Sequence, residues 1–556
     1  MSASYYGPNE VSKELFTRQL VESPPPVISL DIETPSLKEQ FPIGFSIAVS
    51  PVESWYFRTY PENDPEVELI RLLLNNPAIK KVMHNAIFDL RNFPLVYDID
   101  RSNIWDTNVA ARLLGHIETK LKTLSGVILS REIETSEDLL TRHSAKDMRN
   151  VPVEEVAAMC AVHSQCTLQL YYEFVDKIDK EYFAVEMRVI PILIDMSLRG
   201  LGVVEEDRAA LEAQLLKEQD YYKQILLGVD IENPNSTQQV GYILAKRGNF
   251  LPFTKSKKQY RTDEETLEFV EDPIASVVQS YRKITKVLDT YILPLRGKDR
   301  IYTNYNLDAV VGRVSSSDVN MQNIPPRNMG KDEILSEGCR YIFYPDSGTF
   351  TSGDYSQEHT RIIMHKSGDK QMRRIFEEGE CGGDIHQFFA DKMHKSRKLG
   401  KTINLAIPYG ATPYTIRTRA KIKDLKLCAS YLDFWLKTFP DAAEWIRGIQ
   451  KSGFEEGWAE PTLFGRRIRI PEEFNAWGKL DEDAMKRKAV NYPVLGSDGE
   501  IIKRALIICE DKGLPLAVTI HDNITCDGDV EFPIEELENI SPVHIPFEVS
   551  KSERWE

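Results

Sequence analysis

The sequence predicts a multidomain protein of the α+β class, and three observations lead to this prediction. Its 556 residues exceed what one hydrophobic core supports, so at least two structural units are expected. With 42% hydrophobic and 28% charged residues, the composition is that of a folded chain. Two strand-like apolar runs are closely followed by acidic residues: Val27–Leu30 near the start by Asp31, and Leu516–Ile520 near the end by His521 and Asp522. Acidic functional sites are therefore expected in more than one structural unit.

Composition and charge narrow the function classes. The amino terminus has no charged start followed by an apolar stretch, and no apolar run approaches the roughly 20 residues that span a bilayer. We therefore expect a soluble, cytoplasmic protein without a membrane partner. The seven cysteines form no Cys-x-x-Cys pair, so neither a disulfide framework nor a zinc site is expected. The net charge of -16 is unusual for a protein that binds nucleic acid, although basic clusters occur at residues 255–261, 392–401 and 466–469.

Two carboxylates in strand-like surroundings predict a metal site. The aromatic run Tyr341–Tyr344 is followed by the stretch Thr351–Gln357, which contains Asp354. We interpret this region as a strand that ends in a carboxylate. Asp522 closely follows the second strand-like run, Leu516–Ile520. If the two strands are neighbours, the aspartates can hold two divalent ions about 4 Å apart, a spacing that serves in-line phosphoryl displacement. Oxygen ligands favour Mg2+, with Mn2+ as a substitute. For either aspartate alone, ordinary turn chemistry is the simpler explanation.

A second pattern between these segments suits a nucleoside triphosphate. Arg397, Lys401, Leu405 and Tyr409 are spaced four residues apart, so on a helix they lie along one face. The two cations can neutralise phosphate charge, and the last two side chains offer surfaces against which a base pair can pack. His386, upstream, can add another donor to phosphate. The same spacing is typical of any amphipathic surface helix, so the pattern is informative only together with its neighbours.

Nine short segments give these patterns a context. They are Gly312–Asp318, Asn323–Pro325, Asp354–Gln357, Asp384–His386, Arg397–Gly410, Thr462–Arg467, Asn491–Pro493, Ile501–Arg504 and His521–Asp522. Their order is that of family A DNA polymerases, which the chain resembles over roughly residues 190 to 530. The resemblance implies a right-hand polymerase domain of palm, fingers and thumb, in which Asp354 and Asp522 are catalytic and bind two Mg2+ ions. The backbone carbonyl of Tyr355 would join them as a metal ligand.

The same resemblance assigns further residues to the nucleotide and to DNA. Those implied at the incoming nucleotide are Arg397, Lys401, His386, Tyr409, Leu405, Gln357, Glu358 and His359. Those implied along the primer and template are Arg313, Arg487, Asn491, His521 and Gln322. Whether Glu358 and His359 contact the nucleotide is left open. The implied partners are primer–template DNA and dNTPs, with phage replication proteins as further candidates, and we expect a monomer.

Several positions around the nascent base pair depart from the family pattern. His359 stands where the family has the glutamate that blocks a ribose 2'-hydroxyl, and imidazole keeps bulk and one hydrogen-bonding edge. Leu495 replaces a glutamine, and Asn523 replaces the glutamate after the second aspartate. Pro408 removes an amide deep in the expected helix, so we expect a kink that displaces Tyr409. These changes indicate either drift or adaptation to an unusual nucleotide such as 2-aminoadenine.

The amino-terminal third carries acidic motifs of its own. Asp31 and Glu33 point to one face of an extended strand and can bind one ion, and Asp89 follows in a later motif. These motifs resemble those of the proofreading 3'-5' exonucleases of the DEDD class, which implies a ribonuclease-H-like fold. Met159 stands where that class has a water-orienting tyrosine, and His163 where it has a metal-binding aspartate. We therefore expect weak or absent hydrolysis, with His163 as a ligand or base in a rearranged site as the alternative.

The expected organisation is an exonuclease-like domain at residues 1–185 and a polymerase domain at 186–556. Within the second domain we expect the thumb at about 206–300, the palm at about 301–365 and 481–556, and the fingers at about 366–480. The predicted function is DNA-directed DNA synthesis, in a phage because the chain is short and departs freely from the cellular pattern. The alternatives are a primer–template binding protein that has lost catalysis, and a polymerase with a working but altered proofreading site.

Overall fold

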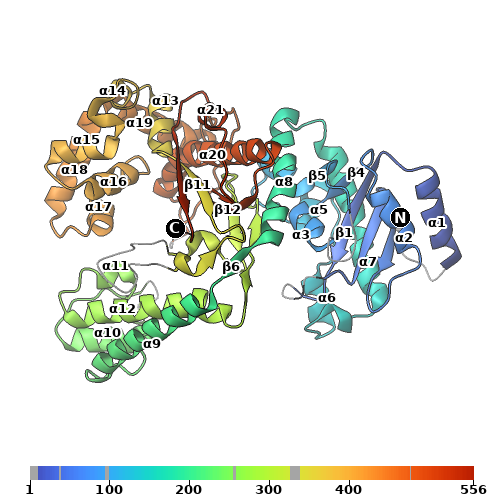
Figure 1. Ribbon diagram of the computed structural model, residues 1–556, viewed down its shortest axis with the longest axis horizontal. Helices are drawn as coiled ribbons and strands as arrows, with labels where there is room; N and C mark the ends of the chain where they lie inside the picture. Colours follow the sequence, from blue (N-terminus) through green and yellow to red (C-terminus); the bar gives the residue numbers. More distant parts are fainter. Residues whose placement is uncertain are drawn as a thin grey trace.

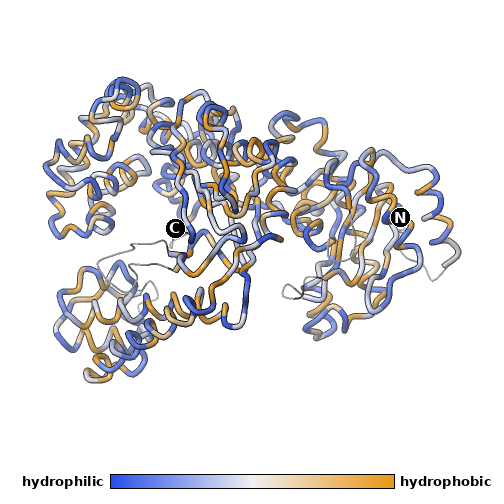
Figure 2. Tube along the Cα trace, viewed as in Figure 1, coloured by the Kyte–Doolittle hydropathy of each residue, from blue (hydrophilic) through white to orange (hydrophobic). Residues whose placement is uncertain are grey.

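The computed structural model describes residues 10–36, 39, 41–93, 99–254, 258–325, 339–475 and 478–555. An amino-terminal domain lies at one end, and two helical lobes of the carboxyl-terminal region face each other at the other end (Figure 1). Apolar segments, orange in Figure 2, occur in the amino-terminal domain, in the central region and in both helical lobes. Among the residues just given, no helix is both long enough and apolar enough to cross a membrane.

A five-stranded mixed sheet of order β3-β2-β1-β4-β5 forms the centre of the amino-terminal domain. Its strands are β1 (Val27–Glu33), β2 (Gly44–Ser50), β3 (Glu53–Arg58), β4 (Lys80–Met83) and β5 (Ile104–Asp106). The helices of this domain are α1 (Glu10–Glu22), α2 (Val67–Leu74), α3 (Ala86–Asn92), α4 (Thr107–Leu113), α5 (Leu121–Leu129), α6 (Ser136–Arg142) and α7 (Val153–Phe174). Ile28, Leu30 and Ile32 of β1 are buried, as expected for a strand that has neighbours on both sides.

Helix α7 lies directly against β1 and β2 because small polar residues line the contact. The Ser29 hydroxyl donates to the carbonyl of Ser164 at 2.6 Å, and the Ser46 hydroxyl donates to the carbonyl of Cys160 at 2.7 Å. These bonds bring the helix backbone within reach of the sheet. They also place His163, one residue from Ser164, beside the acidic end of β1.

Helix α8 (Lys180–Arg199) leads from this domain into the carboxyl-terminal region. Glu186 of α8 and Lys503 of helix α20 (Glu482–Asp511) form a buried ion pair, in which the ammonium nitrogen lies 2.7 Å from both carboxylate oxygens. Removing one partner of a buried pair typically costs about 3–5 kcal/mol. The pair therefore fastens the connecting helix α8 to the long helix α20.

The carboxyl-terminal region consists of two helical lobes and a central sheet. The lobe expected as the thumb contains α9 (Glu205–Leu227), α10 (Thr237–Lys246), α11 (Glu264–Leu267) and α12 (Pro273–Val287). The lobe expected as the fingers contains α14 (Lys370–Phe376), α15 (Ile385–Met393), α16 (Arg397–Ala406), α17 (Pro413–Ala420), α18 (Leu425–Thr438) and α19 (Pro440–Glu456). The central part adds helices α13 (Glu358–Ser367) and α21 (Ile534–Glu538) to α20.

The central sheet, here called the palm sheet, has the order β12-β13-β11-β14. Its strands are β11 (Phe350–Tyr355), β12 (Leu516–Ile520), β13 (Asn523–Asp527) and β14 (Phe547–Ser552). Two smaller sheets are formed by β6 (Leu201–Val203), β7 (Arg300–Ile301) and β10 (Phe343–Tyr344), and by β8 (Asn304–Asn306) and β9 (Ser315–Ser317). The strand predicted near the end of the chain is β12, with the predicted bounds. The aromatic run expected to end in Asp354 instead contributes β10 to another sheet, and Asp354 lies on β11.

The two helical lobes touch at their tips. The Lys421 ammonium nitrogen lies 3.1 Å from a carboxylate oxygen of Glu268, and the Arg417 guanidinium lies 4.1 Å from the centroid of the Phe269 ring. Exposed ion pairs contribute about 0–1 kcal/mol, so this contact is weak enough to open. The lobes therefore meet without being locked together.

Candidate active site

The register of the palm sheet brings Asp354 and Asp522 together. Strand β13 lies between β11 and β12, so the two strands named by the sequence are second neighbours and not direct ones. Asp354 is paired with Asn523, and Asp522 lies in the turn just before it. The Tyr355 amide donates to the carbonyl of Asp522 at 3.2 Å. The Tyr355 hydroxyl is bonded to the carbonyl of Leu537 at 3.0 Å, which fixes the end of β11.

The electrostatics of this pair favour a bound cation. Burial, followed by the charges of Asp522 and Glu548, raises the pKa of Asp354 to about 7, although Lys401 acts in the opposite direction. Burial and the charge of Asp498 raise the pKa of Asp522. Crowded, partly buried carboxylates become favourable as anions when a cation lies among them. The donor set of carboxylates next to a strand-end carbonyl therefore fits hard divalent ions such as Mg2+.

A cavity of about 430 Å³ opens over these carboxylates. Its lining residues are Arg313, Asp354, Tyr355, Ser356, Gln357, Glu358, His359, Thr360, His386, Arg397, Lys401, Leu405, Asp498, His521, Asp522 and Glu548. Most of the residues predicted for the metal and the nucleotide are thus brought to one place. The other predicted residues, Tyr409, Arg487, Asn491 and Gln322, are not part of this lining.

The basic side of the cavity is built on α15 and α16. Asp384 caps α15 by accepting from the amides of His386 and Gln387, and its second oxygen accepts from Arg397 at 2.6 Å. Burial, with help from the nearby cations, lowers the pKa of His386 to about 4, so its imidazole is neutral and can donate one N–H. Lys401 is exposed. Arg397 is exposed as well, so both cations can bind an anionic ligand.

The kink expected at Pro408 is wrong, because the helix ends before it. Helix α16 stops at Ala406, and Tyr409 lies in the turn that follows. A proline lacks the amide that would continue the helical bonds, and Gly410 takes a φ of +79° that permits the tight turn. Only the first three members of the predicted ladder share a helix. The Tyr409 hydroxyl instead contacts Nδ1 of His359 at 2.8 Å.

The residues after Tyr355 have individual roles. The Gln357 side chain donates to the carbonyl of Gly383 and accepts from the amide of Ile385, each at 3.1 Å, so it holds the start of α15. Glu358 is only 2% exposed, and burial raises its pKa well above the ordinary range. His359 is the member of this group whose ring lies between the two sides of the cavity, since it contacts Tyr409 and the palm.

Three of the residues predicted for DNA line a small pocket that shares part of its lining with the cavity. Arg313, Gln322 and His521 line it together, and the Gln322 amide donates to the carbonyl of Val314 at 3.1 Å. Arg487 and Asn491 lie further along helix α20, and Arg487 is exposed. The buried Oδ1 of Asn491 has no hydrogen-bond partner within the described part of the chain. That acceptor is available to a ligand.

Two acidic residues in the cavity were missed by sequence reasoning. Glu548 stands opposite Asp354 in the pairing of β11 with β14, and only the strand order reveals this. Asp498 is 1% exposed and accepts from Nε of Arg313. Its signal in the sequence is an acid two residues after Gly496 and just before Gly499, on a helix face that is otherwise closely packed.

The amino-terminal domain holds a second acidic group. Among the described residues, Asp31, Glu33 and His163 present ligand atoms that lie within 4.8 Å of one another. The imidazole Nδ1 is 3.5 Å from an oxygen of Asp31 and 4.0 Å from one of Glu33, while Nε2 donates to the carbonyl of Glu134 at 2.7 Å. Asp89 is buried nearby, and burial and the charge of Asp31 raise its pKa. The group fits one divalent cation.

A proton can take the place of that cation. Burial alone would lower the pKa of His163, but its contacts with Asp31 and Glu33 raise it to about 9. Met159 is 5% exposed and packs with Ile43 and Tyr56 in a separate apolar cluster. A positively charged imidazole beside the carboxylates reduces their need for a metal ion, and a buried thioether cannot orient water.

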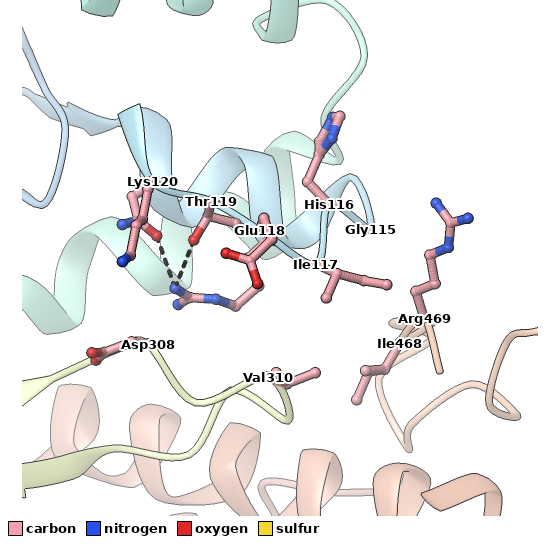
Figure 3. A pocket seen from close by; sticks show the side chains of 12 residues that line it. Gly115, His116, Ile117, Glu118, Thr119, Lys120, Asp308, Val310, Ile468 and Arg469 are labelled. Atoms are coloured by element: carbon pink, nitrogen blue, oxygen red, sulfur yellow. Dashed lines mark hydrogen bonds between the residues drawn. The ribbon is translucent and has the colours of Figure 1, made fainter. Parts of the chain in front are cut away.

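A further cavity, of about 250 Å³, lies where the two domains meet (Figure 3). The loop between α4 and α5 lines one side of it, and Asp308 and Arg469 lie on the other. The Arg112 guanidinium donates to the carbonyl of Leu307 and, at 2.8 Å, to the side-chain oxygen of Asn108. This arginine joins the domains, and we assign the cavity to their junction.

Comparisons with known proteins agree with this fold. The model of the family described as DNA polymerase family A matches residues 203–544, and that described as 3'-5' exonuclease matches residues 9–179. The chain is 29% identical to DNA polymerase I of Chloroflexus aurantiacus over 92% of its own length and 58% of that protein. It is also 29% identical to the thermostable DNA polymerase I of Thermus aquaticus, over 65% of the chain and 45% of that protein. The chain thus spans about half the length of the curated relatives it matches.

The fold has a solved counterpart. The POL domain of Pol1 from M. smegmatis, in complex with DNA primer-template and dNTP, superposes with a TM-score of 0.78. The two share 20% sequence identity, and the superposition covers 99% of each chain. The arrangement of an exonuclease-like domain in front of a polymerase fold is therefore the observed one.

The crowding of acids predicts a gain in stability when one is removed. In EDTA, Asp354→Asn should raise the midpoint of thermal unfolding by about 1–4 °C, because it removes like-charge repulsion in a partly buried site. Added Mg2+ should stabilise the original protein more than the variant. Differential scanning calorimetry measures both effects, with Glu553→Gln at an exposed position as the control. A lower midpoint for Asp354→Asn in EDTA would contradict this account.

Proposed function

Since the chain belongs to DNA polymerase family A, we propose that it is a DNA-directed DNA polymerase that extends a primer 3'-hydroxyl with dNTPs. The observation that carries the proposal is the cavity in which Asp354 and Asp522 face Arg397 and Lys401. The acidic pair can bind divalent ions, and the exposed cations across from it can bind a triphosphate. Primer–template DNA and dNTPs are the partners that this activity requires.

Each part of the cavity has a task in this reaction. Two Mg2+ ions, held by Asp354, Asp522 and the carbonyl of Tyr355, would supply the positive charge that stabilises the attacking and leaving oxygens. Arg397 and Lys401 bind the triphosphate and neutralise the charge that develops on departing pyrophosphate. The protein thereby holds the primer end and the α-phosphorus at reacting distance, which replaces a bimolecular encounter by a positioned one.

The neutral residues complete the cavity. His386 donates one N–H to a phosphate oxygen without adding charge. Leu405 and Tyr409 offer apolar surface to the base pair. Arg313, Gln322 and His521, which line a small pocket beside the cavity, are proposed to contact the primer and template. We also propose that this synthesis serves a phage genome, and the departures of the sequence from the cellular pattern support that role.

Primer extension tests the activity directly. With Mg2+, dNTPs and a defined template, the protein should extend a labelled primer, and Asp522→Ala should reduce the rate by at least about 10³-fold, because the ions lose a ligand. Glu553→Gln should leave the rate unchanged. Gel electrophoresis of the products measures each rate. Binding of primer–template without extension under Mg2+ or Mn2+ would favour the alternative of a binding protein.

We further propose that the exonuclease-like domain hydrolyses DNA weakly or not at all. Support comes from the buried position of Met159 and from the contact of His163 with the carboxylates. The double change Met159→Tyr and His163→Asp should therefore increase primer shortening in the absence of dNTPs by at least about tenfold. Adding Asp31→Ala to this variant should abolish the gain. Shortening by the original protein that is lost on Asp31→Ala would show that its altered site works.

The base preference stays a prediction. Adaptation to 2-aminoadenine would require a group that recognises the extra amino group. Glu358, a carboxylate in the lining of the cavity, is only 2% exposed. A competition between dATP and its 2-amino analogue opposite template thymine measures the preference as a ratio of kcat/KM values. Adaptation predicts that the analogue is used more efficiently, whereas a clear preference for dATP identifies the changes as drift.

A further inference from the structure

Asp498 is a buried carboxylate in the wall of the nucleotide cavity that the reaction described above does not use. It lies on α20, between the backbone of residues 312–313 and the start of α13. A Cβ atom at Gly499 would come within 3.0 Å of the Gly312 carbonyl oxygen and 3.1 Å of the Arg313 Cα. Glycine at this position thus lets the helix approach the Arg313 backbone closely. The neighbouring Asp498 side chain then reaches the guanidinium.

A chain of contacts runs from Asp498 to the fingers. Arg313 donates through Nε to Asp498, and its Nη2 lies 2.7 Å from Nε2 of His359. Since a guanidinium can only donate, Nε2 of His359 accepts this bond. The imidazole hydrogen is then on Nδ1, which donates to the Tyr409 hydroxyl at 2.8 Å. Both ring nitrogens of His359 are occupied, so its orientation is fixed from both sides of the cavity.

Charge explains why Arg313 needs this anchor. The guanidinium lies in a cavity with Asp354 and Asp522, and it would also meet the triphosphate proposed to bind there. A free guanidinium beside these anions would pair with them, because bidentate carboxylate and phosphate contacts are its strongest interactions. Asp498 competes for it from the buried side, and its Oδ1 also lies 3.5 Å from Nε2 of His359. Arg313 is thereby kept against the imidazole.

We propose that Asp498 is a positioning residue that acts through Arg313 to fix His359 as a rigid wall of the nucleotide cavity. The inference rests on the proposed polymerase function. A ring held at both nitrogens keeps the cavity narrow at this wall, so a nucleotide that carries an additional hydroxyl group is excluded by size. Releasing the ring widens the cavity and costs nucleotide binding energy, which makes Asp498 a determinant of the choice between dNTP and NTP.

Single-nucleotide incorporation of dATP and ATP opposite thymine tests the proposal. Asp498→Asn keeps the volume and removes the charge. It should raise KM for dATP about tenfold, change kcat by less than about twofold, and lower the ratio of dATP to ATP efficiencies about tenfold. Asp498→Glu, which keeps the charge, should recover part of that ratio. Asp498→Ser provides the same comparison where calorimetry shows that the asparagine variant does not fold.

Two controls separate positioning from general stability. Glu500 is also buried on α20, but it bonds to Tyr182 and Thr462 and not to Arg313. Glu500→Gln should therefore lower the unfolding temperature without changing the ratio of dATP to ATP. In an Arg313→Ala background, Asp498→Asn should have no further effect on that ratio, since the residue through which it acts is gone.

The outcomes distinguish this inference from the function on which it rests. Failure of the original protein to extend any primer would overturn the proposed function, and the inference with it. An active Asp498→Asn variant with unchanged KM and an unchanged ratio would overturn the inference alone. The same would follow if the change had its full effect in the Arg313→Ala background.

Discussion

The antiparallel pairing of β11 with β13 is the constraint on which the rest of this molecule depends. It puts Asp354 opposite Asn523 and therefore beside Asp522, and β14 adds Glu548 from the other side. Gathering acids in a partly buried place is unfavourable without cations, as the raised pKa of Asp354 shows. The cavity, the exposed Lys401 and the anchored arginines are arranged around this concentration of negative charge. A strand register thus determines both the chemistry and the electrostatic cost of the site.

Local patterns in the sequence were sufficient for much of this arrangement. The bounds of β12 follow from a run of β-prone residues, and the order of short motifs indicates which segments meet at the cavity. The position of β13 between the acidic strands could not be read in this way, because strand order depends on contacts between segments far apart in the chain. For the same reason Glu548 gave no usable signal, and the signal of Asp498, an acid between two glycines, did not identify its partner. Each becomes informative only when the residue facing it is known.

Two predictions made from local sequence patterns were incomplete, because neighbouring residues also determine the structure. The spacing of four residues from Arg397 to Tyr409 suggested one helical face, but Pro408 and the left-handed Gly410 end the helix at Ala406. Tyr409 therefore lies in the turn after the helix, and its hydroxyl contacts His359. In the amino-terminal domain, the replacement of an acid by His163 was visible in the sequence. Its consequence, an imidazole that shares the space between Asp31 and Glu33, required the structure.

The net charge of -16 is compatible with nucleic-acid binding once the partners of the cavity's arginines are known. Arg397 is paired with Asp384, and Arg313 is paired with Asp498. In each case an acid adds to the negative total while it fixes the direction in which a guanidinium points. Fixed cations at the cavity act over short distances, where protein surroundings screen them weakly, whereas the acidic total acts at long range through salt. Orientation of a few cations can therefore matter more at this site than the sign of the whole protein.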